Sequence, residues 1–123
     1  MNEQIKNDWV NALRSGKYKK CRGLLRKSVN EFCTLGVLCD LYAKSNNKTW
    51  RRLKNTGFDG ASYSILDSSR LLPEKIQDWA GIKRTLIDEY EGNYDMTLMD
   101  FNDTLDFTFE EMADLIESKW KDL

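Results

Sequence analysis

Histidine is absent from this sequence of 123 residues, and proline occurs only once. Without histidine the chain lacks the usual general base of cysteine and serine hydrolases and a common ligand of zinc. No apolar run approaches the about 18 residues that a membrane-spanning helix needs, so we expect no membrane contact. The first residues, Met1 to Lys6, contain no apolar signal-peptide core, which predicts a cytoplasmic protein.

Cysteine is scarce as well. Cys21, Cys33 and Cys39 are odd in number, and their spacings of twelve and six residues match neither a disulfide framework nor paired zinc knuckles. We therefore interpret them as reduced, buried thiols, and we expect no metal and no other cofactor.

Apolar residues make up 41% of the chain and aromatic residues 11%, which is enough for a packed core. The length fits one domain over residues 1–123, because domains cluster near about 100 to 150 residues. Internal repeats and Pro/Ser-rich linkers are missing, which favours the same interpretation.

The spacing of apolar residues indicates an α+β fold, with three or four helices packed against a small, mainly antiparallel sheet. Gly16 and Gly81 are placed to end helices, and Thr108 with Glu111 forms a capping box. The predicted elements are a helix over 2–15, a strand over 17–27 forming a hairpin with 31–35, a helix over 36–44, a hairpin of 50–54 with 62–66, a helix from Pro73 to 80, a helical turn or strand within 82–92, a strand over 96–101 and a helix from 109.

Large apolar residues on the inner faces of these elements form the predicted core. They are Trp9, Phe32, Leu38, Leu41, Ile76, Trp79, Leu98, Phe109, Met112 and Ile116.

The charges are unevenly distributed. Residues 1–60 contain 13 Lys and Arg against 5 Asp and Glu, whereas residues 61–123 contain 6 against 15. If the halves separate in space, the basic half attracts phosphates and the acidic half a basic partner. If they interleave, their charges neutralise each other.

Two basic groups contain an aromatic residue, one within 17–27 and one at Trp50-Arg51-Arg52 with Lys54. Arginine makes bidentate contacts with phosphate and aromatic rings stack on bases, so these groups predict a nucleotide or single-strand site. Short cationic strands are also typical of solvated sheet edges. Duplex DNA is a poor candidate, because no recognition-helix motif is present. The candidate ligand-binding residues are Lys20, Arg22, Arg26, Trp50, Arg51 and Arg52.

Two other constellations have structural alternatives. Cys33 precedes a predicted helix, where a thiol pKa is often lowered, but no histidine can serve as its base. Asp100, Asp103 and Asp106 lack the spacing and glycine of a calcium loop, and we interpret them as turn formers.

Four blocks of the sequence carry a family resemblance. They are Trp9 to Tyr18 (WVNALRSGKY), Phe32 to Asp40 (FCTLGVLCD), Leu72-Pro73-Glu74 with Trp79-Ala80-Gly81, and Phe109 to Glu117 (FEEMADLIE). In this order they resemble a widespread family of small accessory proteins encoded by bacteriophages and prophages. That family often has two adjacent cysteines in the second block, whereas here the second is Thr34.

The resemblance implies a non-enzymatic binding protein in the host cytoplasm that antagonises a host function, with anti-phage defence as the expected target. Its partner would be a host protein or a nucleotide-type signal, and a homo-oligomer is compatible with it. The alternatives are a nucleotide or nucleic-acid binder that uses the basic half, and a cysteine-dependent enzyme built around Cys33.

Overall fold

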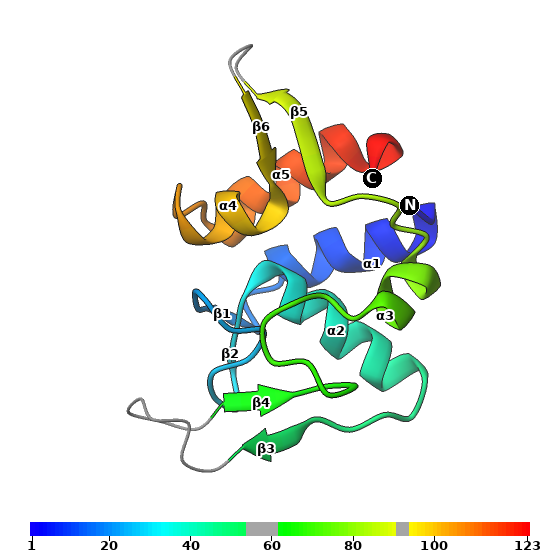
Figure 1. The fold of residues 1–123 in the computed structure, drawn as a ribbon, viewed down its shortest axis with the longest axis vertical. Helices are drawn as coiled ribbons and strands as arrows, with labels where there is room; N and C mark the ends of the chain where they lie inside the picture. Colours follow the sequence, from blue (N-terminus) through cyan, green and yellow to red (C-terminus); the bar gives the residue numbers. More distant parts are fainter. Residues whose placement is uncertain (54–61, 91–93) are drawn as a thin grey trace.

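The computed structural model describes residues 1–53, 62–90 and 94–123, and it has the predicted α+β fold (Figure 1). Five α-helices are present in the described part, one more than the upper prediction. The elements are α1 (Glu3–Arg14), β1 (Lys19–Lys20), β2 (Glu31–Phe32), α2 (Thr34–Ser45), β3 (Arg51–Leu53), β4 (Ser62–Ser64), α3 (Glu74–Ala80), β5 (Leu86–Tyr90), β6 (Tyr94–Thr97), α4 (Leu98–Asp103), α5 (Phe109–Lys119) and the 3₁₀ turn η1 (Trp120–Asp122).

The first and last α-helices pack side by side, although about a hundred residues separate them (Figure 1). α1 begins at Asn2, whose side chain accepts from the Ile5 N–H, and it ends before Gly16 at φ 75°. α5 begins with the predicted capping box of Thr108 and Glu111. The sequence signals that predicted both helices are therefore confirmed.

α2 lies in the middle of the molecule and is buried along most of its length (Figure 1). Its N-cap is Cys33, whose sulfur accepts from the Gly36 N–H. The indole N–H of Trp9 donates to the Thr34 carbonyl at 3.0 Å and so joins α1 to the first turn of α2. This helix consequently holds the elements on either side of it in place.

The strands form three separate two-stranded sheets instead of one. The predicted hairpin of 17–27 with 31–35 is wrong in its main pairing, because β1 and β2 are parallel. An antiparallel bridge does join Arg26 to Phe32, closed by the Lys27 N–H bonding to the Glu31 carbonyl. The chain between β1 and Arg26 bends at Gly23 (φ 78°), so only the end of the predicted basic strand folds back on β2.

The other two sheets are antiparallel. β3 pairs with β4 as predicted, with Arg52 opposite Tyr63, while Lys54 lies outside the described residues. β5 lies within 82–92, where the sequence left a helical turn and a strand both open, and it pairs with β6, which overlaps the start of the strand predicted over 96–101.

The predicted strand over 96–101 is wrong beyond Thr97, where α4 begins. The Thr97 side chain accepts from the Asp100 N–H, and the Asp100 carboxylate accepts from the Thr97 N–H. This capping box starts a helix inside an apolar run whose alternation resembled a strand. α3 also begins one residue later than expected, with Pro73 as its N-cap, and it ends at Gly81 in the left-handed conformation, as predicted.

Seven of the ten predicted core side chains are buried. Leu41, Trp79 and Phe109 are only partly buried and pack against the same cluster. The buried ones are Trp9, Phe32, Leu38, Ile76, Leu98, Met112 and Ile116.

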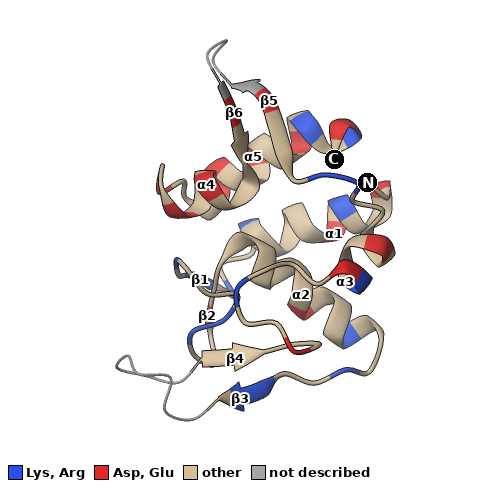
Figure 2. Ribbon diagram, in the orientation of Figure 1, with Lys and Arg blue, Asp and Glu red and all other residues tan. Residues whose placement is uncertain are grey.

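The two halves of the sequence interleave in part: β4 pairs with β3, α3 packs against α2, and the seam between α1 and α5 joins first-half to second-half residues. Figure 2 shows acidic residues on α4 and on β5 and β6, with basic residues on β3 at the far end. Ion pairs join the two halves, including Lys6 with Glu117 and Lys20 with Asp106. Separation and partial neutralisation therefore both occur. None of the helices in the described residues has the length and apolarity needed to cross a membrane.

Candidate functional site

Arg26 lies half-buried among three aromatic rings. Its guanidinium carbon is 4.7 Å from the ring centre of Phe32, 5.5 Å from that of Trp50 and 4.3 Å from that of Tyr63. The same guanidinium donates to the carbonyls of Ser28 and Val29 at 3.0 and 2.8 Å. The side chain thereby stabilises the turn that leads into β2 and joins it to the β3–β4 pair.

Backbone pairing places Arg26 in the middle of a row that crosses four short strands, β1, β2, β4 and β3. Lys20 is paired with Phe32, and Phe32 is bridged to Arg26. Tyr63 donates its N–H to the Arg26 carbonyl and lies opposite Arg52. Neighbouring strands are about 4.8 Å apart, so Lys20 and Arg52 are separated by about 19 Å, too far for one phosphate group to contact both.

Beside this row, the buried carboxylate of Asp40 accepts hydrogen bonds from two aromatic side chains. The Trp50 indole N–H donates at 3.0 Å and the Tyr18 hydroxyl at 2.7 Å. The Lys44 ammonium, one helical turn on, lies 3.1 Å from the same carboxylate. This hydrogen bond raises the pKa of Lys44, and burial raises the pKa of Tyr18, so both remain protonated at neutral pH.

Lys20 and Arg22 are both close to an acidic residue from the other half. Asp106 lies 2.7 Å from the Lys20 ammonium and 4.0 Å from the Arg22 guanidinium. The hydrogen bond from Lys20 lowers the pKa of Asp106. A polar hollow of about 610 Å³ lies beside them, lined also by Cys21, Lys27 and Glu31.

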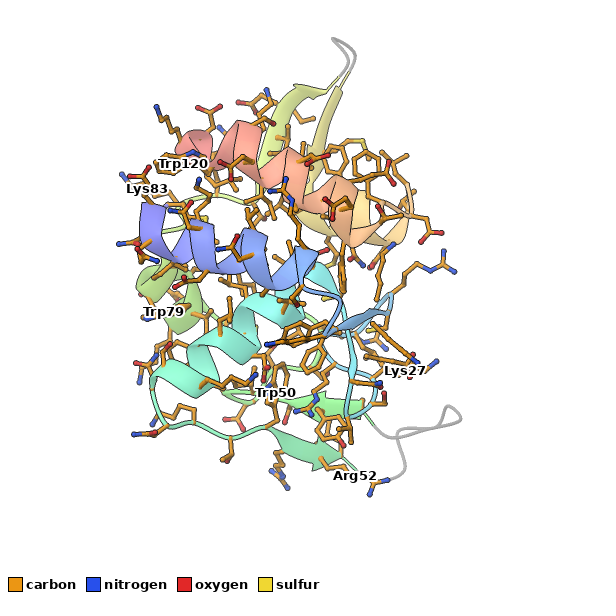
Figure 3. All side chains as sticks on the ribbon, turned by 180° about the vertical axis from the view of Figure 1, so that it is seen from behind. Lys27, Trp50, Arg52, Trp79, Lys83 and Trp120 are labelled. Atoms are coloured by element: carbon orange, nitrogen blue, oxygen red, sulfur yellow. The ribbon has the colours of Figure 1, made fainter. Side chains whose placement is uncertain are left out.

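Arg51 and Arg52 are exposed on β3, and no carboxylate is paired with either among the described residues. β3 is an edge strand of its sheet in the part of the chain that the structure describes, so the sheet-edge interpretation of its charges still applies. Figure 3 shows Arg52 and Lys27 on one side of the molecule, far from Lys83 and Trp120.

The six predicted ligand residues thus divide into three pairs. Arg26 and Trp50 contact each other, Lys20 and Arg22 share Asp106, and Arg51 and Arg52 extend from β3. The sequence interpretation missed Asp40, Tyr18 and Lys44 as a cluster. Lys44 follows Asp40 by four residues, a spacing that pairs side chains on one helix face, and this signal was present in the sequence.

The three cysteines are free and buried. Burial raises the pKa of the Cys21 thiol to about 11 and that of Cys33 to about 12, and it raises the pKa of Cys39 well above its usual range. At Cys33 burial outweighs the lowering effect of the helix N-terminus on the thiol pKa. The thiolate that a nucleophile requires is therefore disfavoured at this position.

The three aspartates of the 100–106 region each have a structural partner. Asp100 closes the capping box of α4, Asp103 accepts from the Asn102 amide and Asp106 pairs with Lys20. Over residues 1–53, 62–90 and 94–123, acidic and cysteine side chains do not gather in any group of three or more suited to a metal ion.

Residues 1–120 match the model of the family described as Domain of unknown function (DUF8296). The chain belongs to this family. Neither the curated proteins nor the solved structures contain a significant match to it. The family description names no activity, so functional inference depends on the geometry of the site.

Proposed function

We propose that this DUF8296 protein is a non-enzymatic binding protein that captures an anionic partner through its basic end. The basic end is defined here by the exposed cations Lys19, Lys27, Lys48, Arg51 and Arg52. The observation that carries the proposal is that none of these five has a carboxylate partner among the described residues, whereas Lys20, Arg22 and Lys44 do.

The immobilised neighbours of these cations support the proposal. Arg26 and Trp50 already use their charge and ring face within the protein, so they give the basic end a fixed shape. Less conformational entropy is lost when a partner binds to such a preorganised surface. The exposed cations then supply attraction that weakens as salt increases.

The resemblance to bacteriophage accessory proteins supports a host component as the partner, in the host cytoplasm. An antagonist of host defence needs to occupy its target and does not need to transform it. The buried, poorly ionised thiols and the lack of histidine are consistent with this interpretation. Single-stranded nucleic acid is the second candidate, because Arg52 lies opposite the aromatic residue Tyr63 in the same sheet.

The test compares two double variants that each remove two exposed cations. Arg51→Ala/Arg52→Ala changes the basic end, and Lys75→Ala/Lys83→Ala removes equal charge elsewhere. Binding of a fluorescein-labelled oligo(dT) and of a labelled polyglutamate peptide is measured by anisotropy at several salt concentrations. For oligo(dT), the first variant is expected to reduce the salt slope by about 1.4, because each phosphate that an arginine no longer neutralises lowers the slope by about 0.7.

The control variant is expected to bind as the parent does. Equal binding by both double variants and the parent would sink the proposal. A preference for polyglutamate over oligo(dT) would favour an acidic protein surface as the partner, and the reverse would favour nucleic acid. Native mass spectrometry of the protein purified from its host then reports any retained partner and the oligomeric state together.

A further inference from the structure

A small hollow next to Asp40 is lined by three cations and one carboxylate, whereas the charged residues of β3 are arginines alone. Its volume is about 270 Å³, and it lies between the turn after Arg26 and the exposed side of α2. The polar side chains that line it are Lys17, Tyr18, Arg26, Asn30, Asp40 and Lys44.

The charges around this hollow do not balance. Lys17, Arg26 and Lys44 contribute three positive charges, and Asp40 contributes one negative charge. The carboxylate of Asp40 is already occupied by three donors, since Tyr18, Lys44 and Trp50 all bond to it. An excess of two positive charges therefore faces the hollow.

Arg26 is the clearest part of this excess. Its guanidinium is compensated by carbonyl oxygens and by ring faces, and among the described residues no carboxylate lies within ion-pairing distance of it. Lys17 is exposed at the rim and likewise has no carboxylate partner in the described part of the chain. The neutral carbonyls and rings around Arg26 stabilise the guanidinium but leave its formal charge without a counter-charge, so it still attracts an anion into the hollow.

We infer that this hollow binds the phosphate group of a small phosphate-bearing ligand, either inorganic phosphate or a phosphate monoester. A phosphate dianion neutralises an excess of two positive charges, whereas a carboxylate leaves one uncompensated. Arg26 offers phosphate oxygens the N–H groups that remain after Nε and Nη2 have each donated to a backbone carbonyl, and the amide of Asn30 provides a neutral donor. The volume is just below the range of about 300 to 1,000 Å³ that is usual for small-molecule sites, which favours a compact ligand over a polymer.

This site goes beyond the proposed function, because it does not depend on Arg51 or Arg52. The Arg51→Ala/Arg52→Ala variant is therefore expected to retain phosphate binding after losing its anionic partner. Failure of one proposal leaves the other intact.

The experiment follows the four tryptophan indole N–H signals in ¹H–¹⁵N spectra while inorganic phosphate is added at constant ionic strength. The Trp50 indole donates to Asp40 and reports on the hollow, whereas Trp120 lies at the other end of the molecule and serves as an internal control (Figure 3). We expect a saturable shift of the Trp50 signal, no shift of the Trp120 signal, and no saturable response to acetate.

Two variants and one change of pH sharpen the test. Lys17→Ala removes an exposed cation with little risk to folding and is expected to weaken phosphate binding at least about fivefold. Lys83→Ala is expected to leave it unchanged. Because the chain has no histidine, weaker binding at about pH 5.5 than at about pH 7.5 reports protonation of the phosphate dianion to the monoanion.

A Trp50 signal that stays fixed, or that moves equally with acetate, would overturn the inference. Phosphate affinity that is the same for Lys17→Ala and the parent would also overturn it. Arg26→Lys provides a second variant: its charge is retained but its planar fork is removed, so weaker binding in a folded protein supports the role of the guanidinium, and unchanged binding contradicts it.

Discussion

The backbone carbonyl of Leu25 occupies the place that a Cβ on Gly36 would take. The same carbonyl accepts the Cys33 N–H at 3.1 Å, so the segment before β2 is held directly against the first turn of α2. Only a residue without a side chain permits this approach of two backbones.

Gly36→Ala is expected to lower the free energy of unfolding by more than about 2 kcal/mol, because backbone atoms must move apart. The sign is diagnostic, since alanine normally stabilises a helix by about 1 kcal/mol relative to glycine. Urea unfolding measures the difference. The control is Gly16→Ala, where φ is 75° but the added methyl group meets open space, and a loss of about 1 kcal/mol is expected. Stabilisation by Gly36→Ala would contradict the close approach of the two backbones.

Asn102 joins α4 to Cys21, directly after β1, and to Thr34, the first residue of α2. Its side-chain oxygen accepts from the backbone N–H and the hydroxyl of Thr34 at 3.0 and 2.7 Å, and its amide donates to the Cys21 carbonyl at 3.1 Å. Asn102→Ala leaves buried polar groups without partners and is expected to cost about 2 to 4 kcal/mol in thermal or urea unfolding. Asn11→Ala, on the exposed side of α1, is expected to be nearly neutral, and equal effects of the two would refute this role.

Lys6 is only 4% exposed, and its ammonium bonds both carboxylate oxygens of Glu117 at 3.0 and 3.1 Å. It also lies 5.1 Å from the ring centre of Trp120. Glu117→Gln is expected to cost about 1 to 2 kcal/mol, because it leaves a buried ammonium with a neutral partner. Glu110→Gln, which removes an exposed partner of Arg14, is the matched control and is expected to cost less than about 0.5 kcal/mol. If Glu110→Gln lowers the free energy of unfolding more than Glu117→Gln does, the pair of Lys6 with Glu117 is not the main stabilising ion pair between α1 and α5.

The raised pKa of the buried Cys33 thiol predicts that the folded protein loses stability in alkaline solution. Burial raises the pKa of Cys33 to about 12, above the value of 9.0 for a free thiol. The unfolded chain therefore releases this proton first, and the corresponding stability, complete below about pH 9, is lost as the pH rises toward about 12. Cys33→Ser keeps an N-cap acceptor and removes the titration.

The Cys33→Ser variant is expected to lose less stability than the parent between about pH 8 and about pH 10.5, as measured by urea unfolding. Comparing the two proteins cancels the deprotonation of lysines, which they share. An identical pH dependence would show that the buried thiol is not the cause. Slow modification by iodoacetamide at pH 8 in the folded protein, with unchanged binding, is the companion result expected for an inert thiol.

Local signals in the sequence identified most helices. Asn2, Gly16 and Thr108 lie at helix ends. Side-chain caps and left-handed glycines depend on residues only a few positions apart, so they can be recognised without knowing the fold. Thr97 and Asp100 form the same kind of local capping box at the start of α4. This helix was nevertheless not predicted, because the alternating apolar residues around the box suggested a strand. The capping signal was the better guide in this case.

Pairings between distant segments were less predictable. The parallel contact of β1 with β2 depends on Gly23 bending the intervening chain and on Gly36 admitting Leu25, and no periodicity in either strand reports such contacts. The candidate site has the same limit. Arg26 and Trp50 were predicted to bind an external ligand, but both also make contacts within the protein, Arg26 with three rings and Trp50 with Asp40. An aromatic residue near a cation has the same sequence signature in both roles.

The packing of α1 against α5 has a consequence for the order in which the chain folds. The inner side of α1 is completed by residues made about a hundred positions later, so closing this contact carries the entropy cost of a long loop. During synthesis α1 can already pack against α2, but the part of its apolar face that contacts α5 stays exposed to water, or is covered by a chaperone, until α5 has left the ribosome. We expect α5 to unfold no later than α1, because α5 packs mainly against α1, whereas α1 also keeps its contact with α2 through Trp9 and Thr34.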